Sequence, residues 1–393
     1  MKVCFITFGC RLNKAEALQM EADYIADGWE VTDDHKDANL FIVRGCSVTR
    51  KAAEESERTI AHLHRHYPTV AVRVCGCLKR SGVGLSKLSP ALNLRRPAGL
   101  AIPVRTARAY LKVQDGCAGK CSFCIVPQFR GTSTSVPFPA LLDHARRFID
   151  AGYREIVVTG CNLSLYASEG KGLPDLVAAL AGLDRSCRIR LGSLEPGACA
   201  TETVHAMAAN ANVCRFLHLT VQSGSSRILS LMRRSYGPKD VSETVGTATR
   251  LMPLLGLGCD LIAGFPDERE LDFEATKSLL KRYPFVRAHV FPFSARPGTP
   301  AAVFPNQVPR GLRAKRAREL MSLVQHGRKA FAQKFLWRTV EVVVESEEKP
   351  VGWTGEYFRC EAEGSAPRKS LVQVVVTNVE DDHLSGRVVT SKE

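Results

Sequence analysis

Residues 115–127 read DGCAGKCSFCIVP and place Cys117, Cys121 and Cys124 in a C-x3-C-x2-C spacing. The segment AYLKVQ at 109–114 precedes them and predicts a β-strand. The cysteines therefore lie on a loop at the carboxyl end of a strand, where (β/α) barrels hold their reactive groups. Three thiolates can hold three irons of a [4Fe–4S] cluster and leave one iron open to a small molecule. A zinc site with a distant fourth ligand, or free buried thiols, are alternatives that this spacing disfavours.

The segments around this loop alternate between apolar strands and helices from about residue 104 to residue 337. Strands are predicted at 109–114, 155–160, 188–193, 216–221, 259–265 and 288–294, with helices between most of them. Six parallel strands with intervening helices predict an α/β unit, a partial (β/α) barrel over residues 99–336, since a complete barrel has eight strands.

The N-terminal segment alternates in the same way over a shorter length. Strands are predicted at 3–8, 38–43 and 69–76, and helices at 14–28 and 49–67. This order predicts a doubly wound α/β domain with a parallel sheet over residues 1–98. A stretch rich in Ser, Pro, Arg and Gly at about 80–99 predicts a linker to the next domain.

A second group of cysteines follows these three N-terminal strands. Cys10, Cys46 and Cys77 each come directly after a glycine at a predicted strand end. Because the carboxyl ends of parallel strands share one edge of a sheet, we expect the three thiols to converge and to hold a second cluster. Coincidence is the alternative, since the chain has 14 cysteines. Cys75 is a rival third ligand, but it lies within its strand and is expected to pack there.

The C-terminal pattern has no helix. Short strands are predicted at 339–346, 352–362, 370–380 and 383–389. Strands of this length without helices predict a small antiparallel β-barrel over residues 337–393.

The charge of the chain points to a polyanionic partner. Fifty-four Lys and Arg against 40 Asp and Glu give a net charge of +14, and nucleic acid is the first candidate. A generally basic protein is the alternative. A basic run lies in the last predicted long helix and favours phosphate contact over a merely solvated face: Arg310, Arg313, Lys315, Arg316 and Arg318. No signal peptide or membrane span is expected, so a cytoplasmic protein with metal-bound rather than disulfide-bonded cysteines is predicted.

Four motifs together resemble one known family. TFGCRLN, VRGCSVT, VCGC and QDGCAGKCSFCIVPQFRG, in this order, resemble the radical S-adenosylmethionine methylthiotransferases over nearly the whole chain. The resemblance implies an N-terminal cluster domain, a radical SAM barrel and a C-terminal TRAM barrel that grips the substrate. It also implies two [4Fe–4S] clusters and S-adenosylmethionine bound at the open iron and cleaved to a 5′-deoxyadenosyl radical. An electron donor such as flavodoxin or ferredoxin, and a sulfur source, are implied as partners.

Within this family the segments VVTGCNLSLY, RIRLGSLEP and HVFPFSARPGTPAA resemble the branch that modifies N6-threonylcarbamoyladenosine at tRNA position 37. The implied substrate is the tRNA anticodon stem-loop, and the implied product carries a methylthio group on C2. Isopentenyl-adenosine in tRNA, or a ribosomal-protein aspartate, are alternatives within the family, and a non-catalytic iron–sulfur RNA-binding protein is an alternative outside it. The chain departs from the family pattern at Thr134, Val136 and Asp267, and in its short segment between Cys77 and Cys117.

Three further residues are candidates for binding the cofactor. Ser193 and Glu195 end a predicted strand and are candidates for the ribose of S-adenosylmethionine, although a solvated glutamate is the plainer alternative. Gln222, followed by Ser223, could contact the methionine part or the substrate, or could form a turn. His218 is expected to be a core histidine, and no catalytic residue is assigned.

Overall fold

The computed structural model describes residues 1–78, 102, 105–346 and 348–389. The predicted linker at 80–99, and with it the boundary between residues 98 and 99, lies outside these residues. Within them no helix is both long and apolar enough to cross a membrane.

The N-terminal domain is a parallel sheet with helices on both faces, as predicted. Its strands, in the order β2–β1–β3–β4, are β1 (Lys2–Thr7), β2 (Glu30–Val31), β3 (Leu40–Gly45) and β4 (Ala71–Gly76). Its helices are α1 (Arg11–Ala26), α2 (Arg50–His66) and the short η1 (His35–Asp37). The alternation along β3 explains the two layers. Phe41 packs in one cluster with Leu63 of α2, whereas its neighbour Ile42 packs in the other with Tyr24 of α1.

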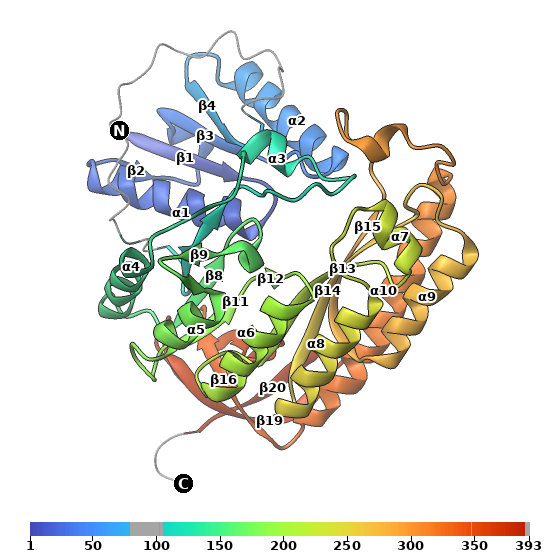
Figure 1. Ribbon diagram of the computed structural model, residues 1–393. Helices are drawn as coiled ribbons and strands as arrows, with labels where there is room; N and C mark the ends of the chain where they lie inside the picture. Colours follow the sequence, from blue (N-terminus) through green and yellow to red (C-terminus); the bar gives the residue numbers. More distant parts are fainter. Residues whose placement is uncertain (79–101, 103–104, 347, 390–393) are drawn as a thin grey trace.

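The central domain forms the predicted partial barrel, in two parallel sheet segments. One contains β5 (Ala109–Lys112), β8 (Glu155–Thr159) and β11 (Arg188–Leu191), and the other contains β12 (Ser193–Leu194), β13 (Phe216–Gln222), β14 (Gly256–Ala263) and β15 (Phe285–Pro292). The strand predicted at 188–193 is thus divided between β11 and β12. The outer layer consists of α4 (Phe138–Asp150), α5 (Leu173–Ala181), α6 (Ala198–Ala209), α8 (Pro238–Leu251), α9 (Glu270–Arg282) and α10 (Arg310–Ala332), as Figure 1 shows.

Shorter elements complete the connections. They are β6 (Gln114–Asp115), α3 (Val126–Arg130), β7 (Thr134–Ser135), η2 (Leu163–Leu165), β9 (Ala167–Ser168), β10 (Lys171–Gly172), α7 (Ser226–Leu231), η3 (Pro300–Val303) and η4 (Gln333–Phe335). Pairing of β6 with β7 holds the Cys117–Cys124 loop and α3 between two short strands. The loop is therefore fixed at both ends rather than only at the end of β5.

The C-terminal domain is a closed five-stranded barrel in the order β16–β17–β18–β20–β19. The strands are β16 (Thr339–Val344), β17 (Val351–Thr354), β18 (Arg359–Glu363), β19 (Leu371–Glu380) and β20 (His383–Val388). The barrel was predicted to be antiparallel, and it is so except that β18 and β20 pair in parallel. The single strand predicted at 352–362 turns back on itself and becomes β17 and β18. A closed ring of five strands cannot alternate direction throughout, so one parallel pair is required.

The C-terminal barrel shares its core with the central domain. Phe216 of β13 and Val286 of β15 pack in one cluster with Phe331 of α10 and Phe358 of the C-terminal barrel. The barrel closes the end of the central domain that lies opposite the N-terminal domain (Figure 1). It is therefore part of the wall of the central barrel and not a loosely attached module.

A buried acid fixes this junction. Glu155 of β8 is fully buried and accepts from Arg188 at 2.6 Å and from Arg190 at 2.8 Å. The same two arginines donate to carbonyl oxygens of the C-terminal barrel, at Trp353 and Thr354. Attraction to the two arginines outweighs burial and holds the pKa of Glu155 far below its usual range, so the carboxylate stays charged.

Candidate active site

The C-x3-C-x2-C loop is folded into a small cradle. Gly116 lies at φ +67°, and a Cβ there would lie 2.0 Å from the carbonyl oxygen of Thr132, so only glycine fits. The Gly119 amide donates to the Cys117 sulfur at 3.3 Å, and a Cβ on Gly119 would lie 3.2 Å from that sulfur and 3.6 Å from the Cys121 sulfur. The loop thus wraps its own backbone around two of the three thiols.

The third thiol of this loop, that of Cys124, is half-buried. Burial raises the pKa of Cys124 to about 11, and the neighbouring Cys121 and Cys117 thiols raise it further. Three thiols this close together are a suitable donor set for an iron–sulfur cluster, since iron displaces the thiol protons on binding. The residues present therefore fit the predicted group.

Arg234, which sequence reasoning missed, joins this loop to the strand ends. Its Nη1 donates to the Cys121 sulfur at 3.0 Å, and its Nη2 donates to Thr220 at 3.1 Å and pairs with Glu195 at 2.9 Å. Glu195 is therefore ion-paired and not simply solvated. Ser193 is the first residue of the short strand β12, and Gln222, at φ +64°, is the last residue of the neighbouring strand β13. Their contact with S-adenosylmethionine, like that of Glu195, stays a prediction.

The structure also brings together the second group of thiols. Gly9 lies at φ +90°, and a Cβ there would lie 2.6 Å from the Cys46 sulfur, so Cys46 packs directly beside the turn that carries Cys10. The Cys77 amide donates to the carbonyl of Gly45 at 3.1 Å. Burial raises the pKa of Cys46 to about 11, with further contributions from Cys10 and Cys77.

Cys75, the rival of Cys77, is directed elsewhere. Its sulfur lies 3.6 Å from Arg44 Nη1 and 3.8 Å from the carbonyl oxygen of Val43, within the N-terminal sheet. The expectation that Cys75 packs is met. Three thiols therefore converge at the edge of the sheet, and they fit a second cluster in the same way as the loop does.

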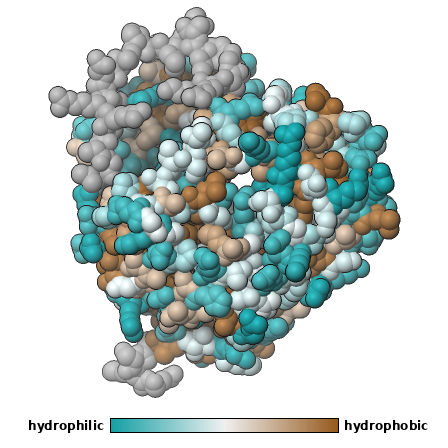
Figure 2. Space-filling model, viewed as in Figure 1, coloured by the Kyte–Doolittle hydropathy of each residue, from teal (hydrophilic) through white to brown (hydrophobic). Residues whose placement is uncertain are grey.

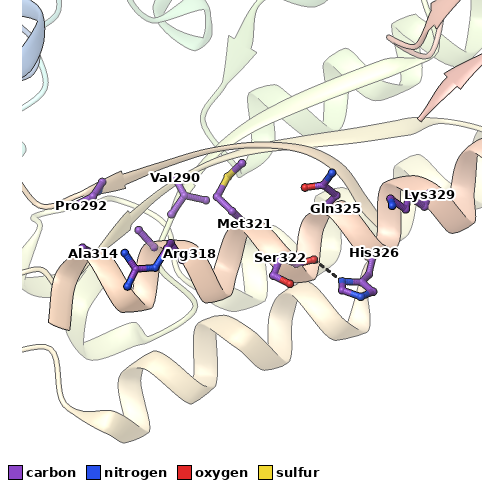
Figure 3. A pocket seen from close by; sticks show the side chains of 10 residues that line it. Val290, Pro292, Ala314, Arg318, Met321, Ser322, Gln325, His326 and Lys329 are labelled. Carbon is purple, nitrogen blue, oxygen red and sulfur yellow. Dashed lines mark hydrogen bonds between the residues drawn. The ribbon is translucent and has the colours of Figure 1, made fainter. Parts of the chain in front are cut away.

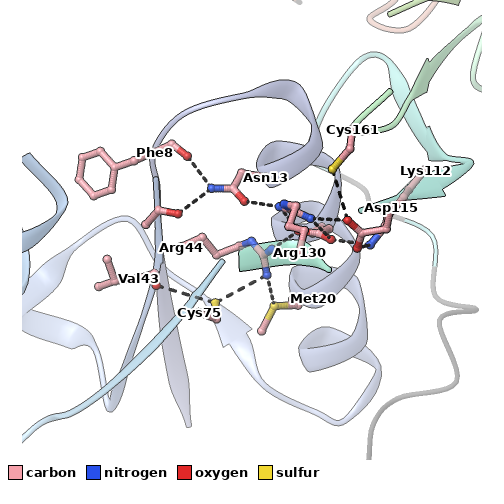
Figure 4. Close-up of polar contacts among 12 residues, drawn as sticks. Phe8, Asn13, Met20, Val43, Arg44, Cys75, Lys112, Asp115, Arg130 and Cys161 are labelled. Carbon is pink, nitrogen blue, oxygen red and sulfur yellow. Dashed lines mark hydrogen bonds and ion pairs between the residues drawn. The ribbon is translucent and has the colours of Figure 1, made fainter. Parts of the chain in front are cut away.

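Arg130 of α3 joins Asp115, at the start of the C-x3-C-x2-C loop, to Asn13 of α1 (Figure 4). It donates to Asp115, two residues before Cys117, at 2.9 Å, and to Asn13 at 2.9 Å. It also pairs with Glu16 of α1 at 3.1 Å. Burial raises the pKa of the Cys77 thiol, and the positive charge of the nearby Arg130 guanidinium opposes this rise. One side chain thus links the loop that carries Cys117 to helix α1 of the N-terminal domain.

The charges in this network are stable at neutral pH. Burial alone would raise the pKa of Asp115, but Lys112 and Arg130 outweigh it and lower that pKa to about 2. Lys112, Arg130 and Arg44 likewise lower the pKa of Glu16 against its burial. The N-terminal domain is therefore held against the central barrel by ion pairs around α1, which lies between the two (Figure 1).

A ladder of rings lines the interior of the central barrel. Asp260 of β14 accepts from His218 and from His289, both at 2.9 Å. His218 was expected to be a core histidine, and it is indeed buried; burial lowers its pKa, although Asp260 opposes this. The ladder continues from His289 through His218 to Phe216 and to Tyr357 of the C-terminal barrel. The surface is open above the ends of β12 and β13, as Figure 2 shows.

The basic helix α10 presents only part of its predicted run to solvent. Arg316 is buried and pairs with Glu268 at 2.8 Å, and Arg313 packs on Gly264 and donates to the carbonyl of Phe293. These two side chains make contacts within the fold, on the face of α10 that covers β14 and β15. Arg318, His326 and Lys329 instead line a groove of about 610 Å³ between α10 and β15 (Figure 3).

Asp267, one of the departures from the family pattern, lies at φ +66°, a conformation that favours glycine. Its carboxylate pairs with Arg227 and accepts from Asn306 at 3.2 Å, which offsets the strain. Thr134 lies in β7, where it pairs with Asp115.

Comparison with known proteins follows the same division of the chain. Residues 2–92 match the Uncharacterized protein family UPF0004, and residues 111–280 match the Radical SAM superfamily. The threonylcarbamoyladenosine tRNA methylthiotransferase MtaB of Chlamydia pneumoniae is 30% identical over 410 residues, which cover 98% of this chain and 97% of that protein. The tRNA-2-methylthio-N(6)-dimethylallyladenosine synthase of Chlorobium phaeovibrioides (strain DSM 265 / 1930) is 33% identical over 382 residues, covering 87% and 85%.

A solved structure supports the fold alone. The radical S-adenosylmethionine methyltransferase TsrM from Kitasatospora setae matches with a TM-score of 0.55 at 13% identity, covering 77% of this chain and 75% of that one. The two relatives, by contrast, cover almost the full length of the chain, and both names describe methylthio chemistry. The chain therefore belongs to the radical S-adenosylmethionine methylthiotransferase family and is an enzyme that uses S-adenosylmethionine and two [4Fe–4S] clusters.

Proposed function

We propose that this enzyme methylthiolates C2 of N6-threonylcarbamoyladenosine at position 37 of tRNA. The observation that carries the transfer chemistry is Arg130, which donates to Asp115 beside the loop of Cys117 and to Asn13 of α1, and whose charge lies near the Cys77 thiol. A radical source and a sulfur-holding site can act on one carbon only if both reach it in the same bound geometry. Residues 1–98 would then supply the sulfur site, residues 99–336 the radical site, and residues 337–393 an RNA-binding surface.

Each cysteine group has its own role in this proposal. Cys117, Cys121 and Cys124 would hold the cluster that binds S-adenosylmethionine, and Cys10, Cys46 and Cys77 would hold the cluster that carries the sulfur. When bound, these groups supply the radical that removes hydrogen from C2 and the methylated sulfur that replaces it. An electron donor such as flavodoxin or ferredoxin and a sulfur source are needed as partners.

The chain's own side chains position these groups. Arg234 holds Cys121 and Glu195 in one network, so the thiol that ligates iron and the candidate ribose ligand are fixed together. Arg130 holds α3 against α1, which keeps the two cysteine groups at a constant separation.

The choice of substrate rests on sequence and on relatives. The segment 289–302 begins with His289, which lines the barrel interior, and it resembles the threonylcarbamoyladenosine branch. One relative that covers nearly the whole chain has that substrate in its name. A second relative is named for dimethylallyladenosine, which is the main competing substrate.

Recognition of the RNA itself would use exposed cations. Arg310, Lys315, Arg318 and Lys329 are exposed along α10, and two of them, Arg318 and Lys329, line the groove of Figure 3. Lys and Arg side chains on one helix face are suited to contacts with the phosphate backbone. Trp337, which is 70% exposed at the junction with the C-terminal barrel, could stack on an unpaired base.

The test is a comparison of three anticodon stem-loops, which carry threonylcarbamoyladenosine, isopentenyl-adenosine or plain adenosine at position 37. Anaerobically reconstituted enzyme, S-adenosylmethionine, a sulfide source and a chemical reductant are supplied, and nucleosides are analysed by mass spectrometry. We expect a methylthiolated nucleoside from the first RNA alone. Methylthiolation of the isopentenyl RNA in preference would make the substrate assignment wrong while leaving the enzyme class intact.

A further inference from the structure

Two arginines from different domains meet around one tyrosine inside the central barrel. Arg11, the residue after Cys10, donates from Nη2 to the Tyr357 hydroxyl at 2.9 Å. Its guanidinium carbon lies 5.2 Å from the centre of the Tyr357 ring, and that of Arg287 of β15 lies 4.5 Å from the same centre. The N-terminal domain and the C-terminal barrel thus touch each other through the interior.

Neither cation has an acid partner among the residues that the structure describes. No ion pair joins Arg11 or Arg287 to any Asp or Glu in the described part of the chain, and Arg287 Nε is buried without a hydrogen-bond acceptor there. Burial, and repulsion from Arg11 among other arginines, lower the pKa of Arg287. Burial alone would raise the pKa of Tyr357, but the surrounding guanidiniums, Arg11 first, outweigh it and lower that pKa instead.

Other arginines of the same barrel have acid partners, so the lack of one at Arg11 and Arg287 is unusual. Arg188 and Arg190 are buried, whereas Arg11 and Arg287 are half-buried, and both Arg188 and Arg190 bind the Glu155 carboxylate. Arg190 also lies over the Tyr357 ring, at 4.8 Å, but it has an acid partner, the Glu155 carboxylate that it shares with Arg188. Buried charges in proteins are normally paired, because an isolated buried charge is costly. Arg11 and Arg287 therefore favour the binding of one anionic group from a ligand.

The position of the pair relates it to the chemistry. Arg11 adjoins Cys10 of the second cysteine group, and Arg287 lies two residues before His289 on the strand that faces the ring ladder. His289 is 43% exposed and is held by Asp260, so the face above Arg287 is open. An adenine lying on this ladder with C2 toward the cysteine groups keeps its N6 substituent within the same interior.

We propose that Arg11 and Arg287 bind the carboxylate of the threonylcarbamoyl substituent and thereby select this substrate. The inference rests on the proposed function, because threonylcarbamoyladenosine carries a carboxylate at the end of its N6 substituent. The isopentenyl substituent is a neutral hydrocarbon. In this site it would leave two cations unpaired and would desolvate them, so it is disfavoured by the same charges that attract the carboxylate.

The experiment compares an anticodon stem-loop that contains threonylcarbamoyladenosine with the same RNA whose carboxylate is converted to a methyl ester. Rates of methylthiolated nucleoside formation are measured for the wild type, for Arg287→Met and for Arg287→Lys. Arg282→Met, at the exposed end of α9, is the matched control. Formation of 5′-deoxyadenosine and thermal melting show that each variant keeps its radical source and its fold. Because Arg287 has no acid partner, its removal should not unfold the protein.

We expect the wild type to prefer the acid over the ester by about 30- to 100-fold, the range that a hydrogen-bonded charge pair provides. Arg287→Met should lower the rate with the acid, leave the rate with the ester, and so bring this preference close to one. Arg287→Lys should keep part of the preference, and Arg282→Met all of it. A wild-type preference that persists in Arg287→Met would overturn the inference alone. If the wild type modifies isopentenyl-adenosine and not threonylcarbamoyladenosine, the proposed function fails and the inference fails with it.

Discussion

Substitution of Arg130 should uncouple radical formation from transfer of the methylthio group. Arg130→Met keeps a long unbranched side chain but removes the contacts with Asn13, Glu16 and Asp115, which are 2.9 to 3.1 Å long. The side chain is only 9% exposed, so these contacts are largely shielded from water. They are also the contacts that join α1 to the radical loop.

The loss of stability depends on the ion pairs that remain at Glu16 after the substitution. Loss of one partner from a buried ion pair costs 3–5 kcal/mol, and because Glu16 keeps Lys112 and Arg44 we expect about 3 kcal/mol of destabilisation. A shift of the N-terminal domain by about 1 Å would lower the transfer rate by about 100-fold. Cleavage of S-adenosylmethionine depends on the cluster held by the loop cysteines and on the Arg234–Glu195 network, which this substitution leaves unchanged, so cleavage should continue.

Arg44→Met is the matched control. Arg44 also binds Glu16 and is 7% exposed, but its contacts lie within the N-terminal domain, at Met20 and Cys75. It should lower the melting temperature to a similar extent without separating the cysteine groups.

The assay follows 5′-deoxyadenosine and methylthiolated nucleoside in the same reaction, with iron content and thermal melting as checks. We expect the ratio of nucleoside to 5′-deoxyadenosine to fall strongly in Arg130→Met and to change little in Arg44→Met. An unchanged ratio in Arg130→Met, or the same fall in both variants, would refute the bridging role of Arg130.

Three other predictions concern separate parts of the chain. Anaerobically reconstituted protein should hold about eight irons per chain, and a measured content of about four irons in folded protein would rule out the second cluster. Glu155→Gln should destabilise the protein by about 3–5 kcal/mol, since Arg188 and Arg190 lose their shared anion, and should speed proteolysis at the C-terminal barrel; an unchanged melting temperature would contradict this. Replacing exposed Arg318 and Lys329 by Ala should lower the slope of log K for tRNA against log salt by about 1 per lost phosphate contact, and an equal slope would place the RNA elsewhere.

The sequence allowed prediction of features that depend on local pattern. Apolar alternation and turn residues located the strands, and the rule that parallel strands end at one edge brought Cys10, Cys46 and Cys77 together across 67 residues of chain. The same reasoning placed Cys117–Cys124 at the mouth of the barrel. It divided the C-terminal strands incorrectly, because the turn at 354–358 has no glycine–asparagine signal and looks continuous.

Contacts between domains could not be predicted from the sequence. Arg130 bonds to residues over 110 positions away in the sequence, and Arg11 bonds to Tyr357 across 346 positions. The periodicity of apolar residues gives no information about contacts at such sequence separations. Arg130 was visible only as a residue of the motif QFRG. Arg316 was grouped with exposed basic residues, because charge alone does not show that Glu268 faces it in the fold. The shared core also means that deletion of the C-terminal barrel would expose Phe216 and Val286, so point substitutions are the cleaner test of RNA binding.

Cys46→Ala tests most directly the claim that two cysteine groups have separate roles in one reaction. The variant is reconstituted anaerobically, its fold is checked by far-ultraviolet circular dichroism, and it is given S-adenosylmethionine, reductant and the threonylcarbamoyladenosine stem-loop. We expect continued 5′-deoxyadenosine formation, because Cys117, Cys121 and Cys124 are untouched, and no methylthiolated nucleoside. Cys121→Ala should abolish both products. Methylthiolation at a near-normal rate by folded Cys46→Ala protein would contradict the assignment of Cys10, Cys46 and Cys77.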